Sequence, residues 1–161
     1  MQRRAAGHSG LQVSRLGLGT LTWGRETRPE DARPLLRAFV EAGGSLVDTA
    51  AAYAAGDAER MIGRMLRAGD VDRDDLVLAT KAGFGIRDGE RVVDTSRAAL
   101  LSDLRASLRR LGTDHIDLWQ LHAWGQAPLE ESLAAVDTAV NAGDVRYAGV
   151  CNFVGWQTAQ A

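Results

Sequence analysis

The chain has 161 residues, of which 45% are hydrophobic and 25% are charged, and its formal net charge is −2. This balance is ordinary for a globular protein and argues against a protein that binds nucleic acid through a basic surface. The sequence has no run of about 18 apolar residues that could span a bilayer, and its start lacks the apolar stretch of a secretory signal. With Cys151 as the only cysteine, we expect a cytoplasmic protein without internal disulfides.

A turn signal between two short extended segments opens the chain at residues 7–14 and predicts a small hairpin. Apolar, strand-like runs follow at residues 45–48, 76–81, 116–122 and 147–152, with helical stretches between them. Glycine follows each predicted helix, where a left-handed residue commonly ends the last turn. These glycines are Gly43, Gly44, Gly69, Gly112 and Gly143. Strands that alternate with helices imply a parallel sheet with right-handed connections.

The predicted helices differ in how clearly their ends are marked. Residues 94–96 offer caps for a helix whose apolar stripe consists of Leu100, Leu104, Leu108 and Leu111. The next helix begins near Pro128, with acidic residues in its first turn, and runs through residue 140. The helix near residues 29–31 contains a proline at position 34, which predicts a late start or a kink.

Polar side chains stand at or just beyond the end of each run, which is where a (β/α)₈ TIM barrel carries its active site. These residues are Asp48, Lys81, His122 and Asn152. A closed barrel uses about 250 residues, so this chain accommodates about five strand-helix units. We therefore predict a single α/β domain: a hairpin at 1–15 and an incomplete barrel at 16–161. The open edge implies that the chain is part of a longer protein, which we favour, or that an associated copy or second chain covers that edge.

A tyrosine, Tyr53, follows Asp48 by five residues on the loop after the second strand. A phenol has an ordinary pKa near 10 and is a poor proton donor at neutral pH unless a nearby cation favours the phenolate. Lys81 can supply that cation, and Asp48 can keep the ammonium charged and oriented. His122 can then donate a hydrogen bond to a substrate carbonyl and hold it beside the phenol.

These residues and their flanking segments together resemble the aldo-keto reductase family, including its branch of potassium-channel beta-subunit-like proteins. The segments that carry the resemblance are residues 16–24, 48–53, 81, 104–122 and 149–153. The resemblance covers essentially the whole chain. It implies an oxidoreductase that reduces aldehydes or ketones to alcohols with hydride from NADPH, the usual cofactor of the family, with NADH not excluded.

The resemblance also implies roles for individual residues. Tyr53 would be the general acid, Asp48 and Lys81 its tuning partners, and His122 the substrate-orienting residue. Cofactor contacts would come from Thr20, Leu21, Asp48, Cys151 and Asn152. Trp23 and Trp124 would line the substrate pocket together with Tyr53 and His122.

Two other functions remain open at this stage. The chain could be a regulatory subunit that binds the cofactor, or an inactive truncated remnant of a reductase. Each site residue alone also has a structural explanation: Asp48 as a turn cap, Tyr53 as surface cover, Lys81 as a solvated strand end and His122 as a buried histidine. Their joint position at successive strand ends favours a site. The three histidines have no metal-ligand spacing, and Gly17 and Gly19 lack the third glycine of a Rossmann fingerprint.

Overall fold

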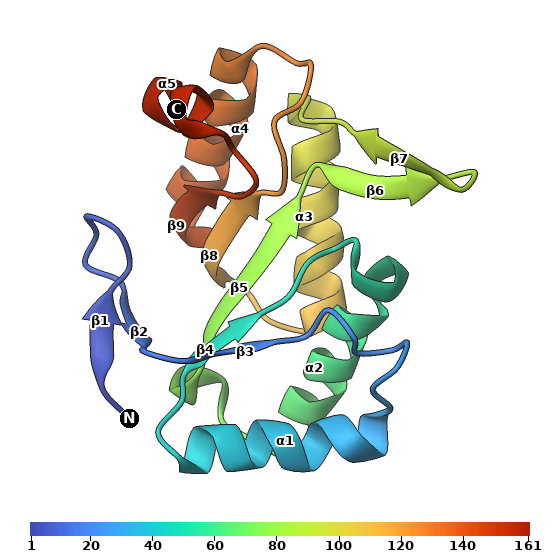
Figure 1. Ribbon diagram of the computed structural model, residues 1–161, viewed down its shortest axis with the longest axis vertical. Helices are drawn as coiled ribbons and strands as arrows, with labels where there is room; N and C mark the ends of the chain where they lie inside the picture. Colours follow the sequence, from blue (N-terminus) through green and yellow to red (C-terminus); the bar gives the residue numbers. More distant parts are fainter.

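The computed structural model describes residues 1–161, with the side chain of Arg87 left out. Within this described part, a five-stranded parallel sheet has the spatial order β3-β4-β5-β8-β9 (Figure 1). Its strands are β3 (Gly17–Gly19), β4 (Leu46–Asp48), β5 (Val77–Ala82), β8 (Ile116–Leu121) and β9 (Val145–Val150). Each strand lies beside the sheet strand that precedes it in the chain, which is the arrangement of a barrel and not of a doubly wound sheet. The predicted partial barrel is confirmed.

Helices follow the strands in the expected alternation. They are α1 (Pro29–Glu41), α2 (Asp57–Arg67), α3 (Arg97–Leu111), α4 (Leu129–Asn141) and α5 (Gly155–Gln160), with short 3₁₀ turns η1 (Tyr53–Gly56) and η2 (Arg73–Asp75). The predicted cap of α3 is Ser96, whose hydroxyl accepts the amide of Ala99, and Gly112 ends this helix with a φ of 69°. Among the described residues, no helix combines the length and apolar character that a membrane span requires.

The core lies between the sheet and the helices that pack on it. Fully buried side chains from both layers meet there, including Leu36 of α1, Ile62 of α2, Leu78 of β5 and Leu104 of α3. The leucine stripe of α3 faces this core, and its arginines lie outside it. Burial of each such side chain contributes roughly 1.5–3 kcal/mol. The packed core therefore stabilises the sheet that positions the residues at the ends of its strands.

The start of α1 excludes one of the two predicted alternatives, the late start. The helix begins at Pro29 and continues through Pro34, so it does not start late. Proline at position 34 removes the hydrogen bond to the carbonyl of Glu30, which lies in the exposed first turn. Water can solvate that carbonyl, and the helix tolerates the proline.

Two hairpins flank the sheet. The predicted one pairs β1 (Arg3–Ala5) with β2 (Gln12–Ser14). The other was not predicted and inserts β6 (Phe84–Arg87) and β7 (Glu90–Val93) between β5 and α3. Its turn residues Asp88 and Gly89 have φ values of 52° and 81°. An Asp-Gly pair between extended segments is a strong signal for this tight turn, so the sequence did contain the information.

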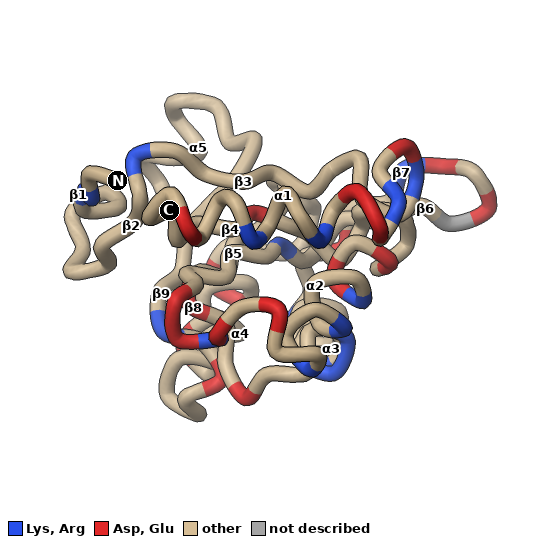
Figure 2. Tube along the Cα trace, turned by 90° about the horizontal axis from the view of Figure 1, so that it is seen from below, with Lys and Arg blue, Asp and Glu red and all other residues tan. Residues whose placement is uncertain are grey.

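Charged residues of both signs are interspersed along the chain (Figure 2). At the amino ends of the strands, Asp117 of β8 is 4% exposed and accepts hydrogen bonds from Arg73 at 2.7 Å and from the Leu78 amide at 2.9 Å. Arg146 of β9 approaches the same carboxylate at 3.4 Å. This network ties η2, β5, β8 and β9 together.

Candidate active site

The carboxyl ends of the parallel strands bring Asp48 and Lys81 into direct contact. Asp48 is the last residue of β4, and Lys81 lies one residue before the end of the neighbouring β5. The Lys81 ammonium donates to both oxygens of the Asp48 carboxylate, at 2.8 and 2.7 Å. Lys81 is only 5% exposed. A buried ammonium needs such a partner, because an unpaired charge would be costly to remove from water.

The ammonium has two further contacts. It donates to the carbonyl oxygen of Thr49 at 2.9 Å and to the hydroxyl of Tyr53 at 3.3 Å, and it lies 5.0 Å from the centre of the Tyr53 ring. Lysine has three donors. The carboxylate, the carbonyl and the phenol accept hydrogen bonds from all three N–H groups. The nitrogen is therefore held with its positive charge beside the phenol oxygen.

A compositional signal for this position was missed during sequence analysis. Of the chain's 19 lysine and arginine residues, Lys81 is the only lysine. An ammonium is a compact point charge, whereas a guanidinium is a wide planar fork. The other 18 lysine-or-arginine positions are all arginine, and the single lysine is enclosed by Asp48, Thr49 and Tyr53, which favours a compact ammonium at this position.

The loop that carries Tyr53 has a strained backbone. Ala54 and Ala55 have φ values of 48° and 53°, and Gly56 follows with 89°. A non-glycine residue in this region costs roughly 1–2 kcal/mol. The loop is held on the sheet because the Ala51 amide donates to the carbonyl of Lys81 at 3.1 Å. Strain of this kind is typical of functional loops, and here it occurs directly beside the phenol.

His122 follows β8 and completes the cluster. Its ring centroid lies 6.0 Å from that of Tyr53 in an edge-on arrangement and 5.0 Å from that of Phe84. Burial lowers the pKa of His122 below its ordinary value of 6.5; the Lys81 ammonium lowers it further, and the Asp48 carboxylate partly opposes this. The imidazole is therefore neutral at pH 7. Its buried Nδ1 has no hydrogen-bond partner among the described residues.

The predicted cofactor residues also lie at the carboxyl ends of the strands, but their surroundings differ. Thr20 is fully buried, and its hydroxyl donates to the carbonyl of Asp48 at 3.0 Å, so it links β3 to β4. Leu21 is 58% exposed. Asn152 has a φ of 56°, and its amide nitrogen donates to the carbonyl of His122 at 2.8 Å and to the sulfur of Cys151 at 3.2 Å. Asn152 is thus held beside His122, with its side chain exposed at the edge of the sheet.

The two tryptophans predicted to line a pocket occupy unlike positions. Trp23 is 2% exposed, and its indole packs in the hydrophobic core. Trp124 lies two residues beyond His122, with its ring 5.2 Å from Phe153 and 5.2 Å from Trp156. Trp156 is 62% exposed and lies at the rim of this aromatic cluster.

Residues 15–161 match the model described as "Aldo/keto reductase family". The chain is 33% identical over 160 residues to the aldo-keto reductase YhdN of Bacillus subtilis, a match that covers 95% of this chain and 47% of that protein. It is 33% identical over 163 residues to a probable voltage-gated potassium channel subunit beta of Oryza sativa, covering 100% of this chain and 49% of that protein.

A solved structure agrees with these sequence matches. The holo form of aldo-keto reductase AKR11C1 from Bacillus halodurans superimposes with a TM-score of 0.85 and 35% identity, covering 95% of this chain and 51% of that chain. The chain therefore spans about half the length of the relatives it matches. Over that half, the residues are 33–35% identical and the structure has the same arrangement of strands and helices as AKR11C1.

Proposed function

Because the chain belongs to the aldo/keto reductase family, we propose that it reduces an aldehyde or ketone to an alcohol with hydride from a nicotinamide cofactor. One observation carries the proposal: the buried Lys81 ammonium contacts the Asp48 carboxylate and the Tyr53 hydroxyl at the same time. The neutral imidazole of His122 faces the same phenol. This set combines a proton donor, a cation that stabilises its conjugate base and a hydrogen-bond donor for the carbonyl.

Tyr53 is the proton donor in this mechanism. As negative charge develops on the carbonyl oxygen, the phenol gives that oxygen its proton. The Lys81 ammonium stabilises the phenolate that results, and Asp48 holds the ammonium beside the phenol. His122 donates a hydrogen bond to the same carbonyl oxygen and holds it within reach of Tyr53.

The carboxyl edge of the sheet fits the nicotinamide end of the cofactor. Asn152 is exposed there, and its contacts with the His122 carbonyl and the Cys151 sulfur fix its amide beside the proposed catalytic groups. We propose that Asn152, Cys151 and the exposed Leu21 contact the cofactor; Thr20 acts through its bond to the Asp48 carbonyl. When bound, the cofactor supplies hydride to the carbonyl carbon. We propose NADPH as the preferred form.

The experiment that tests this function is a turnover assay of the purified protein with small aldehydes, run with NADPH and with NADH. We expect oxidation of the nicotinamide that depends on the aldehyde, with a higher kcat/KM for NADPH. A protein that binds NADPH in a fluorescence titration but turns over no aldehyde would contradict catalysis.

That contrary result would support the second candidate, a regulatory subunit. The observation that favours it is the similarity to the probable potassium channel subunit beta. The presence of His122 favours catalysis, because the channel-associated members of the family tend to lack histidine at the matching position. A protein that neither binds the cofactor nor turns over aldehyde would be an inactive remnant. We also propose a cytoplasmic location, since Cys151 is a free thiol; cell fractionation with a specific antibody would test it.

A further inference from the structure

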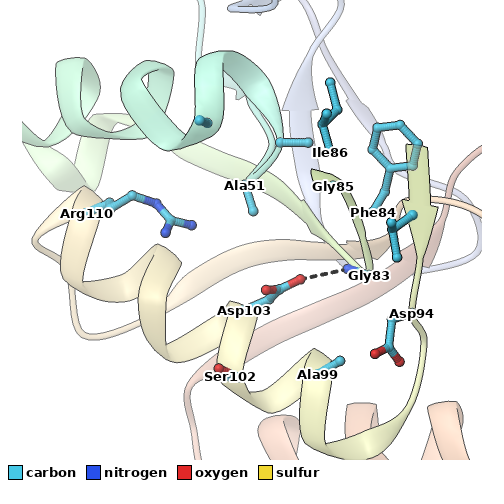
Figure 3. Close-up of a pocket in the computed structure, with 13 residues that line it drawn as sticks. Ala51, Gly83, Phe84, Gly85, Ile86, Asp94, Ala99, Ser102, Asp103 and Arg110 are labelled. Atoms are coloured by element: carbon cyan, nitrogen blue, oxygen red, sulfur yellow. Dashed lines mark hydrogen bonds between the residues drawn. The ribbon is translucent and has the colours of Figure 1, made fainter. Parts of the chain in front are cut away.

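The loop at residues 49–56, which carries Tyr53, backs onto a cavity of about 350 Å³ (Figure 3). Ala51 and Ala55 of the loop line one side of this cavity, and the hairpin of β6 and β7 and the helix α3 line the others. Close packing therefore does not hold the loop on this side. Its position depends on its hydrogen bonds to the sheet and on the helix α2 that follows it.

The first turn of α2 contains a completely buried carboxylate, Glu59, six residues after Tyr53. One of its oxygens accepts the hydroxyl of Thr80 on β5 at 2.6 Å, and the other accepts the Nε of Arg110 on α3 at 2.6 Å. Thr80 immediately precedes Lys81 in the chain. The carboxylate therefore ties the helix that follows the phenol to the strand that carries the ammonium.

Arg110 extends this anchor to the loop itself. It reaches from α3 towards the loop, on the side where Ala51 lies (Figure 3). A Cβ atom at Gly56, the last residue of the loop, would lie 2.7 Å from the Cδ of Arg110, and Gly56 has a φ of 89°. Both the contact and the left-handed backbone require glycine there. At Gly63 of α2, a Cβ atom would lie 2.2 Å from the carbonyl oxygen of Arg110.

A buried ion pair of this kind is seldom needed for stability alone. Well-packed apolar side chains of similar volume are often at least as stable, because both charges lose their water. Short hydrogen bonds to charged groups instead fix distance and direction, which apolar contacts do not. Direction matters at this place because the Lys81 ammonium and the Tyr53 hydroxyl, 3.3 Å apart, belong to different elements.

We propose that Glu59 is a positioning residue for the candidate active site. Through Thr80 and Arg110 it sets the distance between the phenol of Tyr53 and the ammonium of Lys81. Its effect on rate rests on the proposed reduction of carbonyl compounds. The distance that it sets is a property of the protein without substrate, so it can be measured whether or not the protein is a reductase.

NMR of protein labelled at lysine and tyrosine tests this inference without turnover. Lys81 is the only lysine and Tyr53 is one of two tyrosines, so nuclear Overhauser effects between the Lys81 methylenes and the Tyr53 ring can be assigned. Glu59→Gln keeps an acceptor for Thr80 but removes the charge that pairs with Arg110. We expect these Overhauser effects to weaken at least twofold. In the aldehyde assay, we expect kcat to fall about tenfold while the KM for NADPH stays within twofold.

Asp117→Asn is the matched control, because it also removes the charge of a buried carboxylate that pairs with an arginine. It should lower stability but leave the Overhauser effects and kcat at the parent's values. Thr80→Val is a milder variant that keeps the ion pair and removes one hydrogen bond to Glu59. It should change the Overhauser effects in the same direction by a smaller amount.

Unchanged Overhauser effects in Glu59→Gln, or an equal change in Asp117→Asn, would overturn the proposal. Should Glu59→Gln fail to fold, Thr80→Val decides, and unchanged Overhauser effects in that variant would overturn it. Weakened effects in Glu59→Gln alone, in a protein that turns over no aldehyde, would support the positioning role and contradict the proposed reduction.

Discussion

The two ends of the sheet each contain an ion pair between neighbouring elements, with the carboxylate buried at the amino end and the cation buried at the carboxyl end, and the pairs are completed differently. At the amino end, Asp117 meets Arg73 and the Leu78 amide, and the other donors of Arg73 go to backbone carbonyls and to Thr113. At the carboxyl end, the Lys81 ammonium donates one of its hydrogen bonds to the phenol oxygen of Tyr53. An ion pair between neighbouring elements is therefore not a sign of function by itself.

The two ion pairs differ in the other groups that surround them. The amino-end network joins neighbouring elements and includes the His115 imidazole, whose Nε2 lies 3.6 Å from the Asp117 carboxylate, but its described contacts involve no phenol. The carboxyl-end cluster contains a phenol and a neutral imidazole whose buried nitrogen has no partner among the described residues. This matches the general division of TIM barrels, in which the amino end serves stability and the carboxyl end carries the active site.

Exchange of the two kinds of cation tests the comparison most severely. Lys81→Arg keeps the charge but puts a planar fork where an ammonium is enclosed by Asp48, Thr49 and Tyr53. We expect kcat/KM to fall by about a thousandfold, which corresponds to about 4 kcal/mol. Steady-state kinetics with a small aldehyde measure this. A variant within tenfold of the parent would show that the compact ammonium is not required.

The reverse exchange, Arg73→Lys, should affect stability and not rate. Lysine cannot reproduce the contacts of the guanidinium with Asp117, Thr113 and two carbonyls. We expect the free energy of unfolding to fall by about 2 kcal/mol, while kcat stays within about a factor of two. Urea denaturation and the same kinetic assay give the two values. A large loss of kcat in the correctly folded variant would contradict the division of roles.

A smaller effect is expected from the strained loop. Ala54 adopts a φ of 48°, so Ala54→Gly removes the steric cost of the left-handed conformation. We expect the free energy of unfolding to rise by about 0.5–1 kcal/mol after the greater flexibility of glycine in the unfolded state is included. Ala42→Gly is the control, because Ala42 ends α1 with a φ of −75°. That variant should lose stability, and a loss of similar size in Ala54→Gly would argue against strain in the loop.

The smallest effect concerns His122. Its folded pKa lies below 6.5, so its contribution to stability is complete above pH 6.5 and declines as pH falls from 6.5 towards the folded value. An NMR titration of its ring protons measures the pKa directly. Lys81→Met removes a lowering influence and should raise the pKa, whereas Asp48→Asn removes a raising one and should lower it further. Shifts in the opposite directions would refute the assigned causes.

Much of this arrangement follows from the sequence because parallel strands bring their carboxyl ends together. Strand runs that end in Asp48, Lys81 and His122 were sufficient to predict their convergence. The leucine stripe of α3 and its Ser96 cap also act locally, within a few residues. Such signals survive in the folded chain because tertiary packing reinforces them.

Other features depend on contacts that no local pattern specifies. Trp23 is buried because the loop after β3 turns back, where its amide donates to the Thr20 carbonyl at 3.0 Å. Alanine has no preference for a left-handed backbone, so nothing in the residue types at 54 and 55 predicts their strain. A cavity lined by the loop at residues 51–55, by the hairpin of β6 and β7 and by α3 depends on three separate elements. These properties emerge only when the elements pack together.

The central claim is that Tyr53 gives its proton to the carbonyl oxygen, and a matched pair of tyrosine variants tests it most directly. Tyr53→Phe removes the hydroxyl and keeps the ring that contacts His122, whereas Tyr147→Phe changes the chain's other tyrosine, on β9. We predict that kcat falls by about 10²–10⁴-fold in Tyr53→Phe with NADPH binding retained, and that Tyr147→Phe keeps the rate of the parent. A Tyr53→Phe protein that reduces aldehydes at the parent rate would contradict the account.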